Sequence, residues 1–324
     1  MDKKINIGLV GLGNVGSEFY KMVQKEADRF KIIKIAVRDK EKRRKVEVDK
    51  SLLTENISEV FYNPHIDVIV DASNDTPQNI LERIIHKKET VPKAILKPYI
   101  LASKKTMAFY GEEILKFAKE NNLYIGFEAT VCAGIPIVRL LREGHISEKI
   151  IEIAGILNGT TNYILTKMSE GESYEAALLA AQNLGYAEAD PTEDISGLDS
   201  AYKLIILSGL CFGIWKKVDE VKITGINQFA GKIDFSRFGS GEPKLVALAT
   251  RLKDDLFLKV IPCLCGKVST LARRLRETRG VDNLIYIKTE LRELYFSGPG
   301  AGGSVTAAAM MADLNFFASQ MGIE

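Results

Sequence analysis

The chain has 324 residues, of which 46% are hydrophobic and 27% are charged, a composition typical of a globular protein. Its 44 Lys and Arg against 42 Asp and Glu give a formal charge of +2, which excludes the bulk positive field of a protein that coats nucleic acid. No apolar run reaches the roughly 20 residues of a membrane helix, and the start lacks a signal-peptide pattern. We therefore expect a cytoplasmic chain with no membrane or nucleic-acid partner, long enough for two domains.

Cysteine and histidine spacing disfavours two classes of enzyme. No cysteines form a CxxC motif, and no histidines have a zinc-type spacing such as HExxH. The residues concerned are Cys132, Cys211, Cys263, Cys265, His65, His86 and His145. A zinc enzyme or a Ser-His-Asp hydrolase is thus disfavoured, and acid–base chemistry must use Lys, Asp, Glu or Tyr.

The N-terminal segment has the pattern of a dinucleotide-binding unit. Residues 5–10 form a short apolar run typical of a buried parallel strand. Gly-Leu-Gly-Asn-Val-Gly follows at 11–16, then apolar residues at helical spacing, then a second apolar run at 32–37. This order predicts a βαβ unit whose glycines let the backbone approach a pyrophosphate at a helix N-terminus.

The rest of the chain falls into two patterns. Up to about residue 130, helical stretches separate strand-like runs at 68–70, 94–96 and 123–126, which predicts an α/β fold with a Rossmann-type doubly wound parallel sheet. Beyond it we expect an α+β domain, with a strand at 150–156, helices at 174–184 and 198–210, alternating segments at 256–264 and 285–294, and a last helix from about 304 to 319. The predicted domains are an NAD(P)-binding domain (1–130), a substrate-binding and dimerisation domain (131–300), and a C-terminal helix (301–324) that returns to the nucleotide domain.

The end of the second strand bears on the choice between NAD and NADP. Proteins that bind NAD place an acid near this point for the ribose hydroxyls, whereas those that bind NADP place an Arg. Here Arg38 precedes Asp39 and a run rich in Lys and Arg at 40–45. Arg38 can pair with a 2′-phosphate, although a solvated charged loop fits the same residues. We expect NADP(H) to be preferred, with NAD(H) as the alternative.

An acidic segment at 185–199 leads into a helix that carries a candidate proton donor. Asp199 and Lys203 are four residues apart and share a helix face. Such a pair is usually a surface salt bridge, but Leu-Ile-Ile-Leu at 204–207 indicates that this helix is buried. A Lys beside an acid at the mouth of a buried helix can serve in acid–base catalysis, and spacing alone leaves both interpretations open.

Several motifs together resemble one family. Phe-Glu-Ala-Thr-Val-Cys-Ala-Gly-Ile-Pro-Ile at 127–137, Gly-Ile-Leu-Asn-Gly-Thr-Thr-Asn-Tyr-Ile-Leu at 155–165 and the stretch at 185–203 are similar to motifs of homoserine dehydrogenases. With GLGNVG at 11–16 and GPGAGG at 298–303, they follow the family's order over nearly the whole chain. Because the chain stops soon after GPGAGG, the resemblance is to a short form without the C-terminal regulatory domain that senses threonine in longer relatives.

The resemblance implies reversible NAD(P)-linked interconversion of L-homoserine and L-aspartate 4-semialdehyde, on the route to threonine and methionine. It makes Lys203 the proton donor and Lys104 a second active-site lysine. Glu188 and Asp199 match ligands of the substrate ammonium, and Asp194 matches an acid that supports them. The pocket for the amino acid would be lined by Gly159, Thr160 and Tyr186.

The resemblance also implies the cofactor contacts, a cation and a homodimer. The cofactor residues would be Gly11, Gly13, Asn14, Val15, Gly16 and Arg38, together with Ser73, Ser103, Lys104, Gly185 and Gly302. A structural monovalent cation, expected to be sodium, would be held by the Glu128 carboxylate and the carbonyls of Val131, Ala133 and Ile135, since one carboxylate with several carbonyls suits a hard ion of low charge.

Two departures from the family pattern and two other functions stay open at this point. Ser103 stands where an Asn is usual, and Lys105 follows Lys104 and could replace it. Cys132 stands where small residues are common. The chain could instead be a two-domain Rossmann dehydrogenase for another amino acid, such as aspartate or diaminopimelate, or a non-catalytic NAD(P)-binding sensor.

Overall fold

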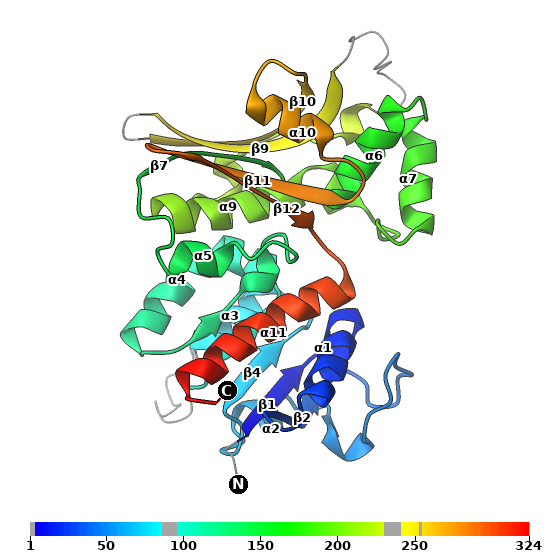
Figure 1. The fold of residues 1–324 in the computed structure, drawn as a ribbon. Helices are drawn as coiled ribbons and strands as arrows, with labels where there is room; N and C mark the ends of the chain where they lie inside the picture. The colour runs from blue at the N-terminus through cyan, green and yellow to red at the C-terminus, as the bar shows by residue number, and fades with distance from the viewer. Residues whose placement is uncertain (1–3, 86–95, 230–240, 253–254, 324) are drawn as a thin grey trace. The chain divides into compact units, whose positions relative to one another are not determined.

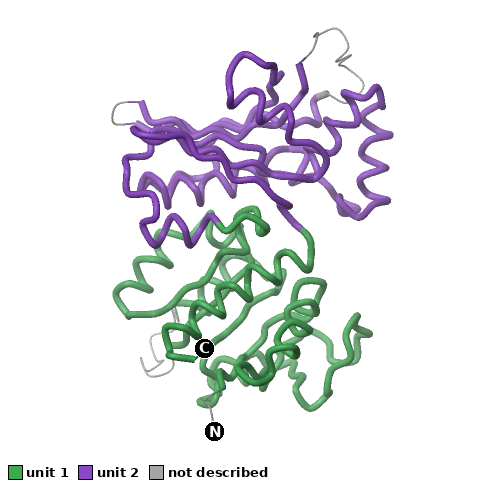
Figure 2. The backbone as a smooth tube through the Cα atoms, viewed as in Figure 1, with its two compact units in different colours: residues 1–136, 302–324 green, residues 137–301 purple. Residues whose placement is uncertain are grey.

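The computed structural model describes residues 4–85, 96–229, 241–252 and 255–323. The chain divides into two compact units, which Figure 2 colours separately: unit 1 comprises residues 1–136 and 302–324, and unit 2 comprises residues 137–301. Unit 1 is therefore built from both ends of the chain, with unit 2 inserted between them. The sequence-based borders lie nearby, at residues 130 and 300, and the roles assigned to those domains remain predictions.

Unit 1 contains a six-stranded parallel sheet with the strand order β3-β2-β1-β4-β5-β6. Its strands are β1 (Ile5–Val10), β2 (Phe30–Ala36), β3 (Leu53–Thr54), β4 (Val68–Asp71), β5 (Tyr99–Leu101) and β6 (Ile125–Gly126). The order reverses direction between β1 and β4, which is where ligands bind in doubly wound sheets. The predicted Rossmann-type fold is confirmed.

Helices of unit 1 pack on this sheet and complete its core. They are α1 (Asn14–Lys25), α2 (Ser58–Phe61), α3 (Pro77–Ile85), α4 (Lys104–Glu120) and α11 (Gly303–Gln320), with 3-10 turns η1 (Lys50–Leu52) and η3 (Glu128–Thr130). Figure 1 shows α1 and α11 side by side. Leu9 of β1, Phe19 of α1 and Leu314 of α11 belong to one apolar cluster, so the C-terminal helix is an integral part of the core of unit 1.

One predicted strand of unit 1 cannot be compared in full. Residues 94 and 95 of the strand expected at 94–96 lie outside the described residues, as does His86. The described strand is β5, three residues long, directly after Pro98. Its brevity and the preceding Pro gave it no pattern that sequence could pick out.

Unit 2 is built on a mixed sheet with the order β12-β11-β7-β9-β10-β8. The strands are β7 (Ile150–Ile156), β8 (Lys222–Ile223), β9 (Glu242–Leu252), β10 (Asp255–Cys265), β11 (Asp282–Thr289) and β12 (Glu293–Pro299). Neighbours are antiparallel except β8 and β10, which are parallel. The alternating segment expected at 285–294 is two strands, because the Thr289 amide donates to the Arg292 carbonyl (2.9 Å) and closes a turn.

Helices cover the two faces of this sheet unequally. They are α5 (Val138–Arg142), α6 (Gly159–Ser169), α7 (Tyr174–Asn183), α8 (Thr192–Ile195), α9 (Leu198–Phe212) and α10 (Thr270–Glu277), with 3-10 turns η4 (Val218–Glu220) and η5 (Asn227–Phe229). In Figure 1, α6 and α9 lie on one face and the short α10 lies on the other. The face with α10 is only partly covered. Among the described residues, no helix is both long and apolar enough to cross a membrane.

A lysine that sequence analysis did not single out lies inside unit 2. Lys244 of β9 is fully buried, and its ammonium donates to two neutral acceptors, Asn162 Oδ1 at 3.0 Å and the Thr278 carbonyl at 2.5 Å. Burial lowers the pKa of Lys244 to about 8 from its ordinary value of 10.5. The lysine thus joins β9 to α6 and to the loop before β11.

This burial predicts a pH-dependent stability. Between pH 8 and 10.5 the unfolded chain binds more protons at Lys244 than the folded chain, so the contribution of this group to stability rises with pH and is lost as pH falls toward 8. In urea unfolding at pH 8 and pH 9.5, the free-energy difference between wild type and Lys244→Met should shift in favour of wild type by about 1–2 kcal/mol. Identical pH slopes for the two proteins would contradict this assignment.

Candidate active site

The turn between β1 and α1 is a close-packed glycine loop. Gly11 has φ +89°, and a Cβ there would lie 2.9 Å from the backbone of Ser73, while a Cβ at Gly16 would lie 2.2 Å from the Gly11 carbonyl oxygen. Around Gly13, by contrast, no atom lies within 4 Å of the Cβ position. Two glycines are therefore required for packing and the third leaves open space. No side chain caps α1 and no acid lies in its first turn, so its positive N-terminus suits a phosphate.

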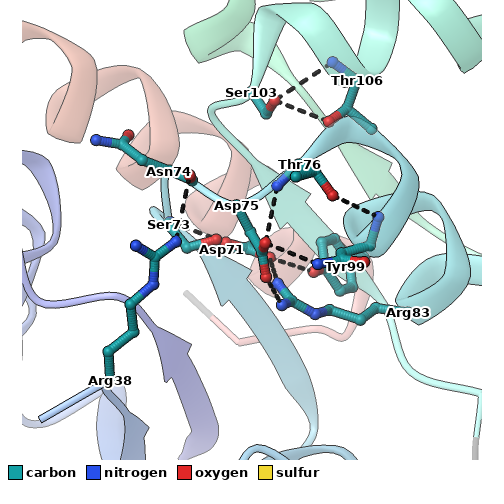
Figure 3. Close-up of polar contacts among 11 residues, drawn as sticks. Arg38, Asp71, Ser73, Asn74, Asp75, Thr76, Arg83, Tyr99, Ser103 and Thr106 are labelled. Atoms are coloured by element: carbon teal, nitrogen blue, oxygen red, sulfur yellow. Dashed lines mark hydrogen bonds and ion pairs between the residues drawn. The ribbon is translucent and has the colours of Figure 1, made fainter.

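Arg38 and the loop after β4 lie next to this turn. Figure 3 shows the Arg38 guanidinium beside Asn74, whose carbonyl accepts from Arg38 Nη2 at 3.5 Å. The Ser73 hydroxyl oxygen is buried and has no hydrogen-bond partner among the described residues. A buried hydroxyl without a partner costs free energy, so a ligand that supplies one would be stabilised there.

A buried carboxylate at the end of β4 fixes the same loop. Asp71 is 2% exposed, and its carboxylate accepts from the Ser73 amide (2.9 Å), the Tyr99 hydroxyl (2.6 Å) and Arg83 Nη1 (3.1 Å). Arg83 also pairs with Asp75, as Figure 3 shows. Burial, and then the Asp71 charge, raises the pKa of Tyr99 well above its usual value, so the phenol stays a donor. Sequence analysis missed Asp71 and Arg83, because only the fold brings α3 to the end of β4.

Ser103 and the two adjacent lysines begin α4. Ser103 is the N-cap, and its hydroxyl accepts from the Thr106 amide (3.3 Å) and hydroxyl (2.8 Å). Ser and Asn are comparable N-caps, so Ser103 can replace the usual Asn without loss of this helix start. Lys104 and Lys105 are both partly buried in the first turn. Consecutive helical residues point about 100° apart, so the two lysines cannot share one role.

The start of α11 lies against the start of α1. Gly302 has φ +127°, a conformation that favours glycine, and a Cβ at Gly303 would lie 3.5 Å from the Asn14 carbonyl oxygen. The Ser304 hydroxyl donates to Glu18 Oε2 at 3.3 Å. The GPGAGG segment therefore brings a second helix N-terminus to the glycine turn between β1 and α1, called the phosphate turn below.

The expected cation residues form a buried loop after β6. Glu128 is 3% exposed, Val131, Ala133 and Ile135 are buried, and the Ile135 amide donates to the Cys132 carbonyl (2.7 Å). Cys132 has a backbone φ of +45°, which residues other than glycine rarely adopt.

Asp313 of α11 holds the start of the cation loop. Its Oδ2 accepts from the Glu128 amide at 2.8 Å, and a Cβ at Gly126 would lie 2.8 Å from Asp313 Cβ. Among the described residues no group of three or more His, Cys, Asp or Glu side chains could hold a metal, so an ion here would depend on carbonyl oxygens. Asp313 was not expected from the sequence, because it lies 185 residues from Glu128.

In unit 2, Lys203 and Asp199 form a buried ion pair on α9. The two side chains are 8% and 3% exposed, and Lys203 Nζ lies 2.7 Å from Asp199 Oδ2. The ammonium also donates to the Leu157 carbonyl at 2.7 Å, just beyond the end of β7. This pair is not the surface salt bridge that spacing alone allowed.

Asn158 gathers the acids of this site and was not singled out from the sequence. Its Nδ2 donates at 2.8 Å both to Asp194 Oδ1 and to Asp199 Oδ2, while its Oδ1 accepts from the Thr161 amide (2.8 Å) and so caps α6. An Asn directly before a helix is a recognisable N-cap signal, but the two acids that it contacts lie 36 and 41 residues away.

The other residues expected to bind the substrate differ in burial and in their contacts. The Thr160 hydroxyl donates to the Tyr186 carbonyl (2.7 Å), and the Tyr186 ring makes an edge contact with Tyr163 (5.2 Å). A Cβ at Gly159 would lie 2.4 Å from the Val281 carbonyl oxygen, so packing alone requires this glycine. Gly185 and Glu188 lie in the exposed loop after α7. Among the bonds described, Asn158 contacts Asp194, Asp199 and Thr161, and neither of these two residues takes part.

Comparison with known sequences agrees with this arrangement. A family model described as "Homoserine dehydrogenase" matches residues 136–314, and one described as "Homoserine dehydrogenase, NAD binding domain" matches residues 11–128. The homoserine dehydrogenase of Bacillus subtilis (strain 168) is 39% identical over 326 residues, which cover 96% of this chain and 72% of that protein. The chain belongs to the homoserine dehydrogenase family.

Solved structures of the family have the same fold. A homoserine dehydrogenase from Thiobacillus denitrificans superposes with a TM-score of 0.82 at 33% identity, covering 96% of this chain and 72% of that one. A hyperthermophilic archaeal homoserine dehydrogenase in complex with NADPH gives 0.76 at 27% identity and covers 99% of both chains. The chain thus spans about three quarters of some relatives and nearly all of another.

Membership of the family establishes the chemistry. The protein is an NAD(P)-dependent oxidoreductase that acts on a CH–OH group, as homoserine dehydrogenases do when they interconvert L-homoserine and L-aspartate 4-semialdehyde. The match decides against a dehydrogenase for another amino acid. Two features suit a bound dinucleotide: the open space beside Gly13 in the glycine turn, and the buried Ser73 hydroxyl without a partner among the described residues.

The buried pair predicts strong energetic coupling in this homoserine dehydrogenase. Asp199→Ala should lower the free energy of unfolding by about 3–5 kcal/mol, because it leaves the Lys203 ammonium buried without its counter-charge. The double variant Asp199→Ala/Lys203→Met should be more stable than the sum of the single effects predicts. Urea unfolding measures all four proteins of this cycle.

An exposed pair serves as the control for that cycle. Lys21 and Glu18 on α1 are 44% and 30% exposed at 2.7 Å, and their coupling should be below about 1 kcal/mol. A coupling of Lys203 with Asp199 no larger than this would show that burial adds nothing to the pair.

Proposed function

We propose that Lys203 is the proton donor of this homoserine dehydrogenase, and that Asp199 and Glu188 bind the substrate ammonium with support from Asp194. The observation that carries the proposal is the buried contact of 2.7 Å between Lys203 Nζ and Asp199 Oδ2. This contact combines an ammonium, a carboxylate and burial where the first turns of α9 meet the end of β7. Gly159, Thr160 and Tyr186 then line the amino-acid pocket.

The chemistry requires a proton at a defined atom. In the direction of reduction, nicotinamide supplies a hydride to the aldehyde carbon, and negative charge develops on the oxygen. Lys203 Nζ donates its proton to that oxygen, which yields the homoserine hydroxyl and a neutral amine. In the direction of oxidation the amine takes the hydroxyl proton back. The Leu157 carbonyl and Asp199 hold Nζ on its other sides, which restricts the direction in which its remaining proton points.

We propose NADP(H) as the preferred cofactor, held by Gly11, Gly13, Asn14, Val15 and Gly16, by Arg38, and by Ser73, Ser103, Lys104, Gly185 and Gly302. Asp39, the acid that could bind the ribose hydroxyls of NAD, uses its Oδ1 to accept from the amides of Glu41 (2.8 Å) and Lys42 (3.1 Å). The Arg38 guanidinium has no carboxylate partner in that loop and suits a 2′-phosphate. The archaeal relative whose structure contains NADPH supports the same choice.

A sodium ion is proposed at Glu128 with the carbonyls of Val131, Ala133 and Ile135. The burial of this loop and its anchoring by Asp313 support a structural role for the ion, separate from hydride transfer. Because homoserine dehydrogenases are biosynthetic enzymes with small-molecule substrates, we also propose that the protein works in the cytoplasm.

A homodimer is proposed through the partly covered face of the sheet in unit 2. Along β10 the buried Leu256 and Leu258 alternate with Phe257, which is 49% exposed, and with the partly exposed Ile261, whose register partner Val246 is on the same face. Exposed apolar residues on a sheet face that α10 leaves open suit pairing with a second copy.

Removing the proposed donor should separate binding from turnover. Lys203→Ala should keep the dissociation constant of NADPH within about threefold, while kcat for homoserine oxidation falls by roughly two to four orders of magnitude. The single variants Lys104→Ala and Lys105→Ala, assayed in parallel, should show by their loss of kcat which of the adjacent lysines belongs to the site. Near-wild-type kcat in Lys203→Ala would remove this residue from the donor role.

The proposed dimer makes a direct statement about mass in solution. Sedimentation velocity should give the mass of two chains for wild type and of one chain for the double variant Phe257→Asp/Ile261→Asp, since two charges cannot be buried without partners. Leu179→Asp, at a leucine on α7 that is 58% exposed, should leave the dimer intact. A wild-type protein that sediments as a monomer at micromolar concentration would sink the proposal.

A further inference from the structure

Arg83 of α3 connects the two ends of one short turn. Its Nη1 lies 3.1 Å from Asp71 Oδ2, at the end of β4, and its Nη2 pairs with Asp75, four residues later. The side chains of Arg83 and Asp71 are 17% and 1% exposed, so the inner contact is shielded from solvent. A planar guanidinium can bridge two carboxylates in this way, whereas a single ammonium cannot do so with the same geometry.

The turn that Arg83 closes carries Ser73, which is proposed to contact the dinucleotide, and Asn74, which contacts Arg38. Ser73 lies in the middle of the turn, and its backbone packs so closely on Gly11 that a Cβ at Gly11 would lie 2.9 Å away. The Ser73 hydroxyl oxygen is buried and has no partner among the described residues. The next carbonyl, that of Asn74, accepts from Arg38 Nη2 at 3.5 Å. Figure 3 shows the contact of Arg38 with Asn74 and the contacts of Arg83 with Asp71 and Asp75 on the same short turn.

We propose that Arg83 is a positioning residue for the dinucleotide, which sets the Ser73 hydroxyl and the Arg38 guanidinium through the turn 71–75 and thereby contributes to the preference for NADP(H). The inference rests on the proposed roles of Ser73 and Arg38. Arg83 itself contacts Asp71 and Asp75, so it acts through them and needs no contact with the cofactor.

Loss of Arg83 has a predictable order of effects. Asp71 keeps its bonds from Tyr99 and from the Ser73 amide, so β4 and β5 stay joined. Asp75 loses the guanidinium but keeps its bonds from the Thr76 amide (2.8 Å) and Asn79 Nδ2 (2.9 Å), so the outer end of the turn is held by fewer contacts. The Asn74 carbonyl is then held less firmly beside Arg38. Binding of a 2′-phosphate should suffer more than binding of the parts that NAD and NADP share.

The test is a comparison of NADPH and NADH binding by calorimetry. Arg83→Met should weaken NADPH binding on the order of tenfold and NADH binding by about threefold or less. Arg83→Lys should lie between wild type and Arg83→Met, because it keeps the charge and loses the bridge. KM for homoserine should stay within about twofold, which a general loss of structure would not allow.

The matched control is Arg29→Met in the same unit. Arg29 bridges Glu26 Oε2 and Asn315 Oδ1, both at 2.9 Å, and directly precedes β2. It therefore lies at the amino ends of the strands, whereas the glycine turn lies at the carboxyl end of β1. It should leave both dinucleotide affinities within about twofold. If Arg83→Met fails to fold, Asp75→Asn removes only the outer ion pair and should give a smaller shift in the same direction.

A double variant separates this inference from the function on which it rests. If Arg83 acts through Arg38, the loss of NADPH affinity caused by Arg38→Ala should be several-fold smaller in the Arg83→Met background than in wild type. Full additivity, or equal losses for NADPH and NADH in Arg83→Met, overturns the role of Arg83 alone. No effect of Arg38→Ala in wild type overturns the proposed role of Arg38 and the inference with it.

Discussion

The contact between Lys203 and Asp199 is the interaction on which unit 2 depends. Burying an ammonium costs several kcal/mol unless a counter-charge and further acceptors accompany it. Here the counter-charge comes from the preceding turn of α9 and the acceptor from the Leu157 carbonyl beyond β7. The strand and the helix must therefore meet at one register, and Asn158 holds that register by contacting Asp199 while it caps α6. The proposed reactive site and the junction of β7, α9 and α6 thus share the same few residues.

Unit 1 meets a different constraint, which is steric before it is electrostatic. The phosphate turn is closed by backbone contacts that no Cβ could share at Gly11 or Gly16. Around this fixed turn lie charged and polar side chains from separate elements, Arg38 after β2 and the loop after β4. The rigid part of the site is thus encoded locally, whereas the proposed selectivity for NADP(H) depends on groups that tertiary structure brings together.

How much could be predicted from the sequence follows from that difference. The glycine turn, the parallel sheet and the pair on α9 have local signals, namely fixed glycine spacing, short apolar runs and an i, i+4 relation. Strand β9 has none, because most of its residues are buried on both faces and its pattern does not alternate. Arg83, Asp313 and the second role of Asn158 were missed because each depends on a partner that only the fold brings near. The domain roles and the site assignments come from the family resemblance, and mutagenesis must test them.

The division of the chain has a consequence for its synthesis. Unit 2 is one continuous stretch, residues 137–301, whereas the core of unit 1 includes Leu314 and other residues of α11. A ribosome releases the N-terminal strands first, yet their apolar surface stays without its last helix until residues 303–320 have been made. Unit 2 can therefore complete its fold first. Until α11 has been made, the apolar surface of unit 1 that it covers stays exposed and can bind chaperones.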